Sequence, residues 1–245
     1  MNQKFSRTTI WIRTYNQSCT AGPDDIASIM LKKYIAGLIH PLLHLFNLSL
    51  SSGSFSALWK IAYMFPVHKT ATSDTLTTTV ALALCELVIL DPIFSHCRSL
   101  IVDTQYGFLP GRSTTTNQLD FTSYVLDGMP KGVQTDVIYT YLSATFDKLD
   151  HDIAIAKLER MGFCGSLLRW FRSYLTGRSL CVKIGDLLSF CFLASSGIAQ
   201  GSHIGSIIFV LYFNDSSLSR ARISVRSISG HFQGEGLALS RQINY

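Results

Sequence analysis

Two aspartates and a histidine that follow a β-branched, aromatic run are the residues of this chain best suited to chemistry. The run covers residues 136–142, and Phe146-Asp147 and Asp150-His151 come after it. A strand that carries an acid and is followed by this pattern could bring carboxylates together, as two-metal phosphoryl transfer requires. The same aspartates are also suited to capping the next helix, and the residues alone favour caps.

Basic residues in the segment 165–184 offer a second kind of chemistry, the binding of phosphate. These residues are Arg169, Arg172, Arg178 and Lys183. Positive charge attracts a nucleic-acid backbone, although a solvated basic face is the simpler explanation. The aromatic residues of the same segment have helical spacing, which favours core packing over base stacking. They are Trp170, Phe171 and Tyr174.

The histidines and cysteines do not indicate a metal site or a disulfide framework. His40 and His44 have helical spacing but no third ligand nearby, and the six cysteines include no C-x-x-C pair. A large apolar chain does not depend on disulfides for its stability. We therefore expect reduced, buried thiols and no bound metal.

The composition predicts a folded chain with an unusually apolar surface. The chain has 245 residues, of which 47% are hydrophobic and 15% are charged, and its net charge is +5. An average soluble domain has roughly 25% charged residues, so exposed apolar patches or poor solubility are expected. The mild positive charge is compatible with nucleic acid as a partner.

Membrane insertion and secretion are not expected. The longest near-apolar run, residues 80–90, is interrupted by Glu86 and is too short to span a bilayer. The first 18 residues lack the apolar core of a secretory signal. We expect an intracellular location, nuclear or cytoplasmic, and no membrane partner.

The remaining pattern predicts a helix-rich α+β fold. Helices are expected over 26–34, 36–50, 81–94, 115–129, 151–161 and 165–175, strands over 59–67, 136–142, 180–184 and 188–193, loops over 70–79 and 195–206, and a buried apolar run over 207–213. Gly185-Asp186 is typical of a two-residue hairpin turn. Strands do not alternate regularly with helices, so a doubly wound sheet is not favoured.

Several motifs occur in a characteristic order over residues 20–215. They are Gly22-Pro23-Asp24, Phe46-Asn47-Leu48-Ser49-Leu50 with Trp59-Lys60, Gln105-Tyr106-Gly107-Phe108 with Gly111-Arg112-Ser113-Thr114, residues 136–151, 158–163 and 170–178, and residues 196–205 with Asn214-Asp215. Together they resemble the reverse transcriptase of non-LTR retrotransposons of the LINE and jockey type. Each motif is weak alone, whereas their order and spacing make a strong resemblance.

The resemblance implies the fingers and part of the palm of a right-hand polymerase. The fingers would cover about residues 21–130 and the partial palm about 131–215. Residues 1–20 are expected to form an irregular lead-in. Residues 216–245 look like a non-homologous tail produced by a shift of reading frame. The palm sheet would then be incomplete, with an exposed edge suited to self-association, and the thumb would be missing.

The departures from the family argue against polymerase activity. In the family two Mg²⁺ ions lie between two carboxylate-bearing strands, and the first metal-binding Asp stands six residues before the position of Asp147. That position is Tyr141 here, and a neutral phenol cannot replace a carboxylate as a ligand of Mg²⁺. The second strand should carry an adjacent Asp pair after Asp215, but the only acid there is Glu235. No catalytic residue, metal ligand or cofactor is therefore expected.

Smaller departures agree with decay of the motifs. Ser143-Ala144-Thr145 replaces Ser-Lys-Ala, an Asn-Tyr-Arg-Pro segment is missing after Asp74, and Ala199 and Ser206 stand where the family has prolines. We therefore expect the chain to be a truncated, degenerate copy.

Five residues remain candidates for contact with an RNA template and a DNA primer. The resemblance places Arg112 near the template strand and Gln200-Gly201 against the nucleotide and template, where glycine permits close backbone approach. A solvated turn arginine and a plain glycine turn are equally good explanations. Arg172 and Arg178 complete the set through their charge.

The sequence thus predicts an inactive reverse-transcriptase-like fragment. One alternative is a module that keeps weak, salt-sensitive affinity for RNA or an RNA–DNA hybrid. Another is a pseudogene product that folds poorly and has no function. A different enzyme built on Asp147, Asp150 and His151 would need their side chains to converge in a pocket, which residues at one helix start rarely do.

Overall fold

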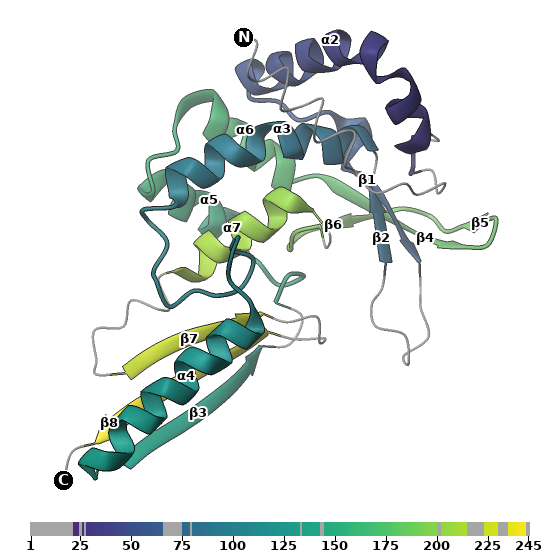
Figure 1. Ribbon diagram of the computed structural model, residues 1–245. Coiled ribbons are helices and arrows are strands. Elements are labelled where there is room, and N and C mark those ends of the chain that lie inside the picture. The colour runs from purple at the N-terminus through teal and green to yellow at the C-terminus, as the bar shows by residue number, and fades with distance from the viewer. Residues whose placement is uncertain are drawn as a thin grey trace.

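The chain folds into two groups of strands with helices packed around them (Figure 1). The computed structural model describes residues 22–24, 26, 28–65, 75–78, 80–132, 134–142, 145–199, 202–214, 223–229 and 235–243. Within these residues the expected α+β class is confirmed. The division into fingers and palm stays a prediction.

Six α-helices and two short 3-10 helices form the helical part of the described chain. They are α2 (Ser28–Ser52), α3 (Val80–Cys97), α4 (Thr114–Gly128), α5 (His151–Arg160), α6 (Gly165–Leu175), α7 (His203–Phe213), η1 (Ala57–Lys60) and η2 (Met129–Lys131). The two helices expected between residues 26 and 50 are one continuous helix, α2, with Pro41 inside it. Proline removes one hydrogen bond, the one to the carbonyl of Gly37, and the remaining bonds carry the helix past it.

The first sheet has the strand order β2-β1-β4-β5, and β6 also pairs with β4. Its strands are β1 (Ile61–Phe65), β2 (Thr75–Thr78), β4 (Arg178–Ile184), β5 (Leu187–Leu188) and β6 (Phe192–Ala194). β1 and β4 run parallel, and the other pairs are antiparallel. The polar stretch that was expected to be loop therefore contributes β2, because pairing with β1 overrides its weak local signal.

The second sheet has three described strands, and whether it is the incomplete palm sheet stays a prediction. β3 (Gln134–Leu142) pairs with β8 (Glu235–Ile243), and β8 pairs with β7 (Ile223–Ser229), all antiparallel. Figure 1 shows α4 lying along this sheet. The tail thus supplies two strands where none was expected, and the period-two spacing of Leu237 and Leu239 was the available signal. The origin of the tail in a frame shift stays a prediction.

An aromatic core joins the helices. Phe55 packs edge-on against Trp59, Trp170 and Tyr174, with ring centroids 5.2 to 5.5 Å apart. Trp170 and Tyr174 stack at 5.6 Å, and both are fully buried, as is Phe171. The core role predicted for these three aromatic residues is confirmed.

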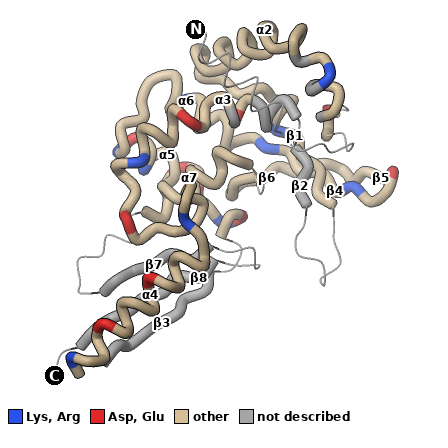
Figure 2. Tube along the Cα trace, in the orientation of Figure 1, with Lys and Arg blue, Asp and Glu red and all other residues tan. Residues whose placement is uncertain are grey.

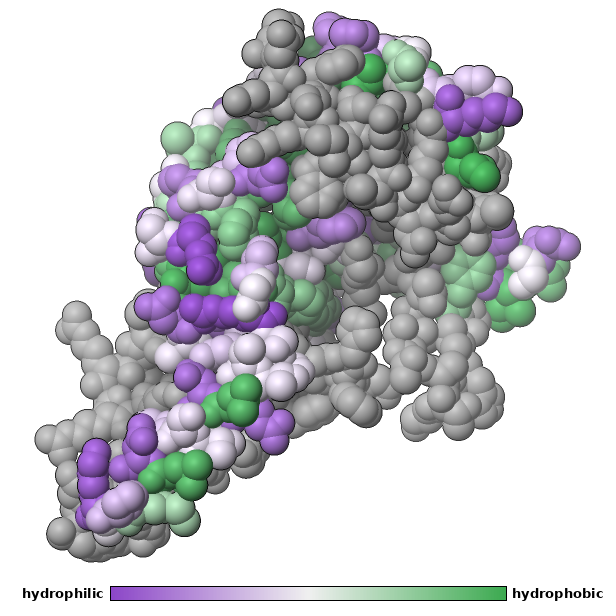
Figure 3. Space-filling model, viewed as in Figure 1, coloured by the Kyte–Doolittle hydropathy of each residue, from purple (hydrophilic) through white to green (hydrophobic). Residues whose placement is uncertain are grey.

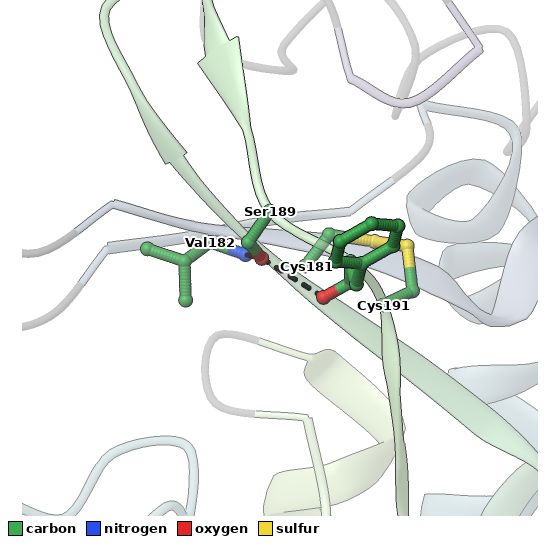
Figure 4. The surroundings of a disulfide bond; sticks show 5 residues. Cys181, Val182, Ser189 and Cys191 are labelled. Carbon is green, nitrogen blue, oxygen red and sulfur yellow. Dashed lines mark hydrogen bonds between the residues drawn. A yellow bond between two sulfur atoms is a disulfide. The ribbon is translucent and has the colours of Figure 1, made fainter.

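The hairpin formed by β4, β5 and β6 contains a disulfide between Cys181 and Cys191 (Figure 4). The expectation that all thiols are reduced is therefore wrong for this pair. The two cysteines face each other across neighbouring strands with their Cα atoms 4.3 Å apart, within reach of a disulfide. Sequence spacing alone could not reveal this, because the two residues are ten positions apart.

A bulge lies next to the disulfide and explains how the strands stay paired. Lys183 opposes Leu188, but Leu180 opposes Phe192, so one extra residue is inserted between β5 and β6. The Val182 N–H donates to Ser189 Oγ at 2.9 Å, and the Ser189 hydroxyl replaces a backbone acceptor (Figure 4).

The other described thiols are unpaired. Burial raises the pKa of Cys85 to about 12, with help from the neighbouring Glu86, and that of Cys97 to about 11. Both thiols therefore stay protonated and inert at neutral pH. Cys164 is exposed. Cys19 lies outside the described residues.

The surface is as apolar as the composition predicts. Figure 2 shows charged positions spaced widely along the described trace, and Figure 3 shows hydrophobic residues on the projecting hairpin. The exposed residues of this hairpin include Ile184, Leu187, Leu188, Phe190, Phe192 and Leu193. No helix among the described residues is long and apolar enough to cross a membrane.

Replacing Phe190 by serine is expected to raise the soluble concentration of the protein severalfold without changing its melting temperature. The side chain is 100% exposed, so it adds to an apolar patch and contributes no packing. Light scattering and thermal melts of both proteins would measure the two effects. Leu119→Ser, at an exposed position on α4, is the control and should improve solubility less. A large loss of melting temperature in Phe190→Ser would contradict the expectation.

Candidate functional site

Two motif segments meet through backbone hydrogen bonds: the turn after β3 and the loop before α7. The Gly197 N–H donates to Leu149 O, and the Ile198 N–H donates to Phe146 O, each at 2.8 Å. The Ser196 hydroxyl donates to Asp147 O at 2.8 Å. A Cβ atom at Gly197 would lie 2.8 Å from backbone atoms of this turn, so glycine is the residue that allows the contact.

Asp150 and His151 of the turn have structural roles in this arrangement. Asp150 caps α5, accepting a hydrogen bond from the Ile153 N–H at 2.9 Å. His151 is buried, and its Nε2 lies 2.8 Å from Gly197 O, which requires a protonated Nε2 because a carbonyl only accepts. Asp147 is exposed. The interpretation of Asp150 as a helix cap is confirmed.

The backbone register places Tyr141 and Glu235 at the same end of the second sheet. Tyr141 is paired with Gly236, and Leu142 is paired with Glu235. The position that resembles a metal ligand is thus paired in register with a glycine. Among the residues described, no group of three or more His, Cys, Asp or Glu could hold a metal ion.

A pocket opens where α4 begins, at the motif that contains Arg112. Its lining includes Tyr106, Gly107, Phe108, Arg112, Ser113, Thr114 and Asn117. Ser113 caps α4 by accepting from the Thr116 N–H at 3.1 Å, and Thr116 Oγ1 accepts from the Ser113 N–H at 2.9 Å. This capping box fixes the entrance of the helix beside Arg112.

Arg112 is held by its own loop. Its guanidinium donates to Gln105 O at 2.6 Å and to Asp103 O, and it lies 3.5 Å from the Asp103 carboxylate. It also stacks over the Tyr106 ring at 5.1 Å. The side chain is only 20% exposed, so it closes the loop and differs from the solvated turn arginine that was one expectation. Contact with a template strand stays a prediction.

Three aromatic rings connect this pocket to the other motif segments. Phe108 packs edge-on against Phe146 at 5.6 Å and against Phe209 of α7 at 6.1 Å, while Phe146 and Phe209 stack at 4.6 Å. Phe108 has a φ of 56°, a conformation that costs energy for a residue with a side chain. The rings therefore join the segments around residues 105–114, 146–151 and 196–209 into one unit.

A buried carboxylate that the sequence pattern did not single out positions α7. Glu86 is 1% exposed and accepts hydrogen bonds from the Tyr174 hydroxyl at 3.0 Å, the Ser202 hydroxyl at 2.8 Å and the His203 N–H at 2.8 Å. Ser202 also caps α7, because its Oγ accepts from the Gly205 N–H at 2.8 Å. Burial, and then the charge of Glu86, raise the pKa of Tyr174 far above its usual value. The sequence signal that could have revealed this role is that Glu86 is a lone acid inside an apolar run.

Asn214 is a second structural residue that sequence reasoning assigned only to a motif. Its side chain is buried, donates to Leu100 O at 2.8 Å and accepts from the Val102 N–H at 3.0 Å. It thereby ties the end of α7 to the segment that follows α3.

The remaining site candidates do not form one surface with Arg112. Arg172 is exposed and donates to Asp152 at 2.8 Å. Arg178 is 3% exposed and lies over the Tyr174 ring, so it is not part of a solvated basic face. Lys183, which is partly exposed, lies over the Tyr63 ring. Gln200 and Gly201 lie outside the described residues.

Comparison with known proteins supports the coarse resemblance. No family model matches the chain. Over 205 residues the chain is 23% identical to a Drosophila melanogaster protein named probable RNA-directed DNA polymerase from transposon BS. The match covers 79% of this chain and 22% of that protein, so the chain spans about a fifth of its relative. Over most of its length the chain is thus similar to a transposon reverse transcriptase.

Proposed function

We propose that this chain is a fragment of a non-LTR retrotransposon reverse transcriptase that no longer polymerises DNA. The order of its motifs and its similarity to a transposon polymerase support the ancestry. The observation that carries the loss of activity is Tyr141, which stands at the first metal-ligand position and is paired with Gly236.

The chemistry of the metal site explains why this change matters. Two divalent ions activate the primer hydroxyl and stabilise the leaving pyrophosphate, and both need anionic oxygen ligands. A tyrosine hydroxyl titrates near pH 10 and is neutral at ordinary pH. Glu235 is the only acid after Asp215 and cannot replace an adjacent aspartate pair.

Restoring the first ligand by Tyr141→Asp is expected to leave primer extension undetectable, as in the unmodified chain. The reason is that the second carboxylate strand would still lack its aspartate pair. The assay is extension of a DNA primer on an RNA template with Mg²⁺ or Mn²⁺, with an active reverse transcriptase as positive control. Tyr139→Asp, two residues earlier on β3, is the matched control. Extension by Tyr141→Asp and not by Tyr139→Asp would refute this explanation.

A second candidate function is binding of RNA or an RNA–DNA hybrid without catalysis. The net charge of +5 and the arginine-containing pocket where α4 begins favour it. Positive charges beside a helix N-terminus are suited to phosphate.

If the chain binds such a hybrid, its affinity is expected to fall steeply with salt, because binding releases counterions. Fluorescence anisotropy against KCl concentration would measure the slope. Arg172→Gln is expected to lower that slope by about one unit if Arg172 contacts a phosphate. Arg160→Gln removes the same charge from the end of α5 and should change the slope less. Equal slopes for all three proteins would count against a phosphate contact at Arg172.

The third candidate is a product without function, which self-associates through the exposed edge of β3. The apolar hairpin and the low content of charge favour it. A cooperative thermal transition of a monomer would exclude poor folding.

A further inference from the structure

Two cations lie side by side where β1 and β4 begin. The parallel register pairs Ile61 with Ser179, so Lys60, the last residue of η1, is the lateral neighbour of Arg178, the first residue of β4. Lys60 Nζ lies 3.4 Å from Ser173 Oγ and 3.9 Å from where a Cβ atom of Gly177 would stand. Burial and the nearby charge of Arg178 lower the pKa of Lys60. The two positive charges are therefore close enough to repel each other.

Arg178 is buried, and it forms no ion pair with another described residue. Its side chain is 3% exposed, its Nη2 is buried without a hydrogen bond, and its contact is the face of Tyr174 at 5.7 Å. Within the described part of the chain, no carboxylate forms an ion pair with Arg178 or Lys60. A desolvated guanidinium without a partner is costly, and such groups in folded proteins call for an explanation, of which a bound ion is one.

Glu86, a buried acid that meets the same tyrosine as Arg178, forms no ion pair with either cation among the described residues. Glu86 is bound to the hydroxyl of Tyr174, whereas Arg178 lies over the ring of the same residue. The carboxylate already accepts three hydrogen bonds, from Tyr174, Ser202 and His203. The C-terminus of α6 near Lys60 offers only about half a negative charge. The cluster thus keeps an excess of positive charge.

We propose that Lys60 and Arg178 form a binding site for a phosphate group. A phosphate dianion accepts hydrogen bonds from a guanidinium fork and attracts an ammonium as a point charge. Lys60 is partly exposed, so the ligand arrives from its side and meets Arg178 already desolvated. Ser173 Oγ lies beside Lys60 Nζ as a neutral hydrogen-bonding group.

The phosphate group belongs either to a nucleic-acid backbone or to a free phosphate compound. The site does not depend on the proposed function, because inorganic phosphate alone serves as the probe. An RNA–DNA duplex forms the second arm of the test.

The test compares the melting temperature of the chain in phosphate and in chloride at matched ionic strength and pH. At phosphate concentrations about ten times the dissociation constant, we expect a rise of roughly 3 to 5 °C for the unmodified chain. Lys60→Gln should melt higher than the unmodified chain in chloride, because the repulsion is relieved, and should not respond to phosphate. Lys183→Gln, at another partly exposed lysine next to an aromatic ring, is the matched control and should keep the response.

An equal rise of the melting temperature in phosphate for the unmodified chain and for Lys60→Gln would refute the proposed site. A lower melting temperature of Lys60→Gln in chloride would overturn it as well. Equilibrium dialysis of labelled phosphate against both proteins gives the same comparison without a thermal transition, and equal binding there refutes the site. A Lys60-dependent response to the duplex as well as to phosphate identifies the backbone as a ligand. A response to phosphate alone keeps the site and rejects nucleic-acid binding through it.

Discussion

Replacing Glu86 by alanine is expected to lower the free energy of unfolding by about 3 to 5 kcal/mol, because it leaves a buried polar network without its central acceptor. Three donors converge on this carboxylate: the Tyr174 hydroxyl, the Ser202 hydroxyl and the His203 N–H. The first is completely buried, so water cannot replace the lost partner. The variant also removes the tie between α3 and the start of α7.

Urea denaturation followed by tryptophan fluorescence would measure this loss. Glu86→Gln keeps one acceptor oxygen and should cost about 1 to 2 kcal/mol. Asp152→Ala removes an acid from an exposed ion pair with Arg172 and should cost less than about 1 kcal/mol. A Glu86→Ala variant as stable as Asp152→Ala would show that the network does not stabilise the fold.

Elements with a strong local pattern were predictable from the sequence. The helical spacing of Trp170 and Tyr174 indicated a buried face, and Gly185-Asp186 indicated the hairpin turn that joins β4 and β5. Asp150 was correctly interpreted as a helix cap. In each case the information lies within a few residues of the chain.

Features that depend on distant partners were not predictable. Glu86 interrupts an apolar run, and only the approach of α7 turns it into a cap for another helix. The loop that Arg112 closes is held by carbonyls seven and nine residues away, which no helical or strand period connects. The disulfide between Cys181 and Cys191 depends on a bulge that shifts the strand register by one residue.

In the candidate site, packing and metal binding place different demands on the sequence. The packing of Phe108, Phe146 and Phe209 keeps three motif segments together. Packing of this kind requires only apolar volume and tolerates the loss of individual polar residues. Binding of Mg²⁺ instead requires particular carboxylates, and a neutral residue at a ligand position does not supply one. The proposed loss of polymerase activity therefore does not require a loss of the packing that joins these segments.

Gly197→Ala is expected to destabilise the protein by about 3 kcal/mol, because two costs add at this position. The residue has a φ of 86°, which a side chain rarely adopts. Its Cβ atom would also lie 2.8 Å from the Cα and O atoms of Asp147 and from Phe146 O, none of which can move without displacing the turn. The loop would then separate from the turn, and the hydrogen bond from His151 to Gly197 O would be lost.

Gly185→Ala separates these two costs. Gly185 has a φ of 58° in the hairpin turn, but no atom lies within 4 Å of its added Cβ. It should therefore show the conformational cost alone, about 1 kcal/mol.

Hydrogen exchange of the Ile198 amide, which donates to Phe146 O, would test the contact directly. Faster exchange in Gly197→Ala and unchanged exchange in Gly185→Ala are expected. Equal stability losses in the two variants would mean that the turn and the loop are not held together by the close approach at Gly197.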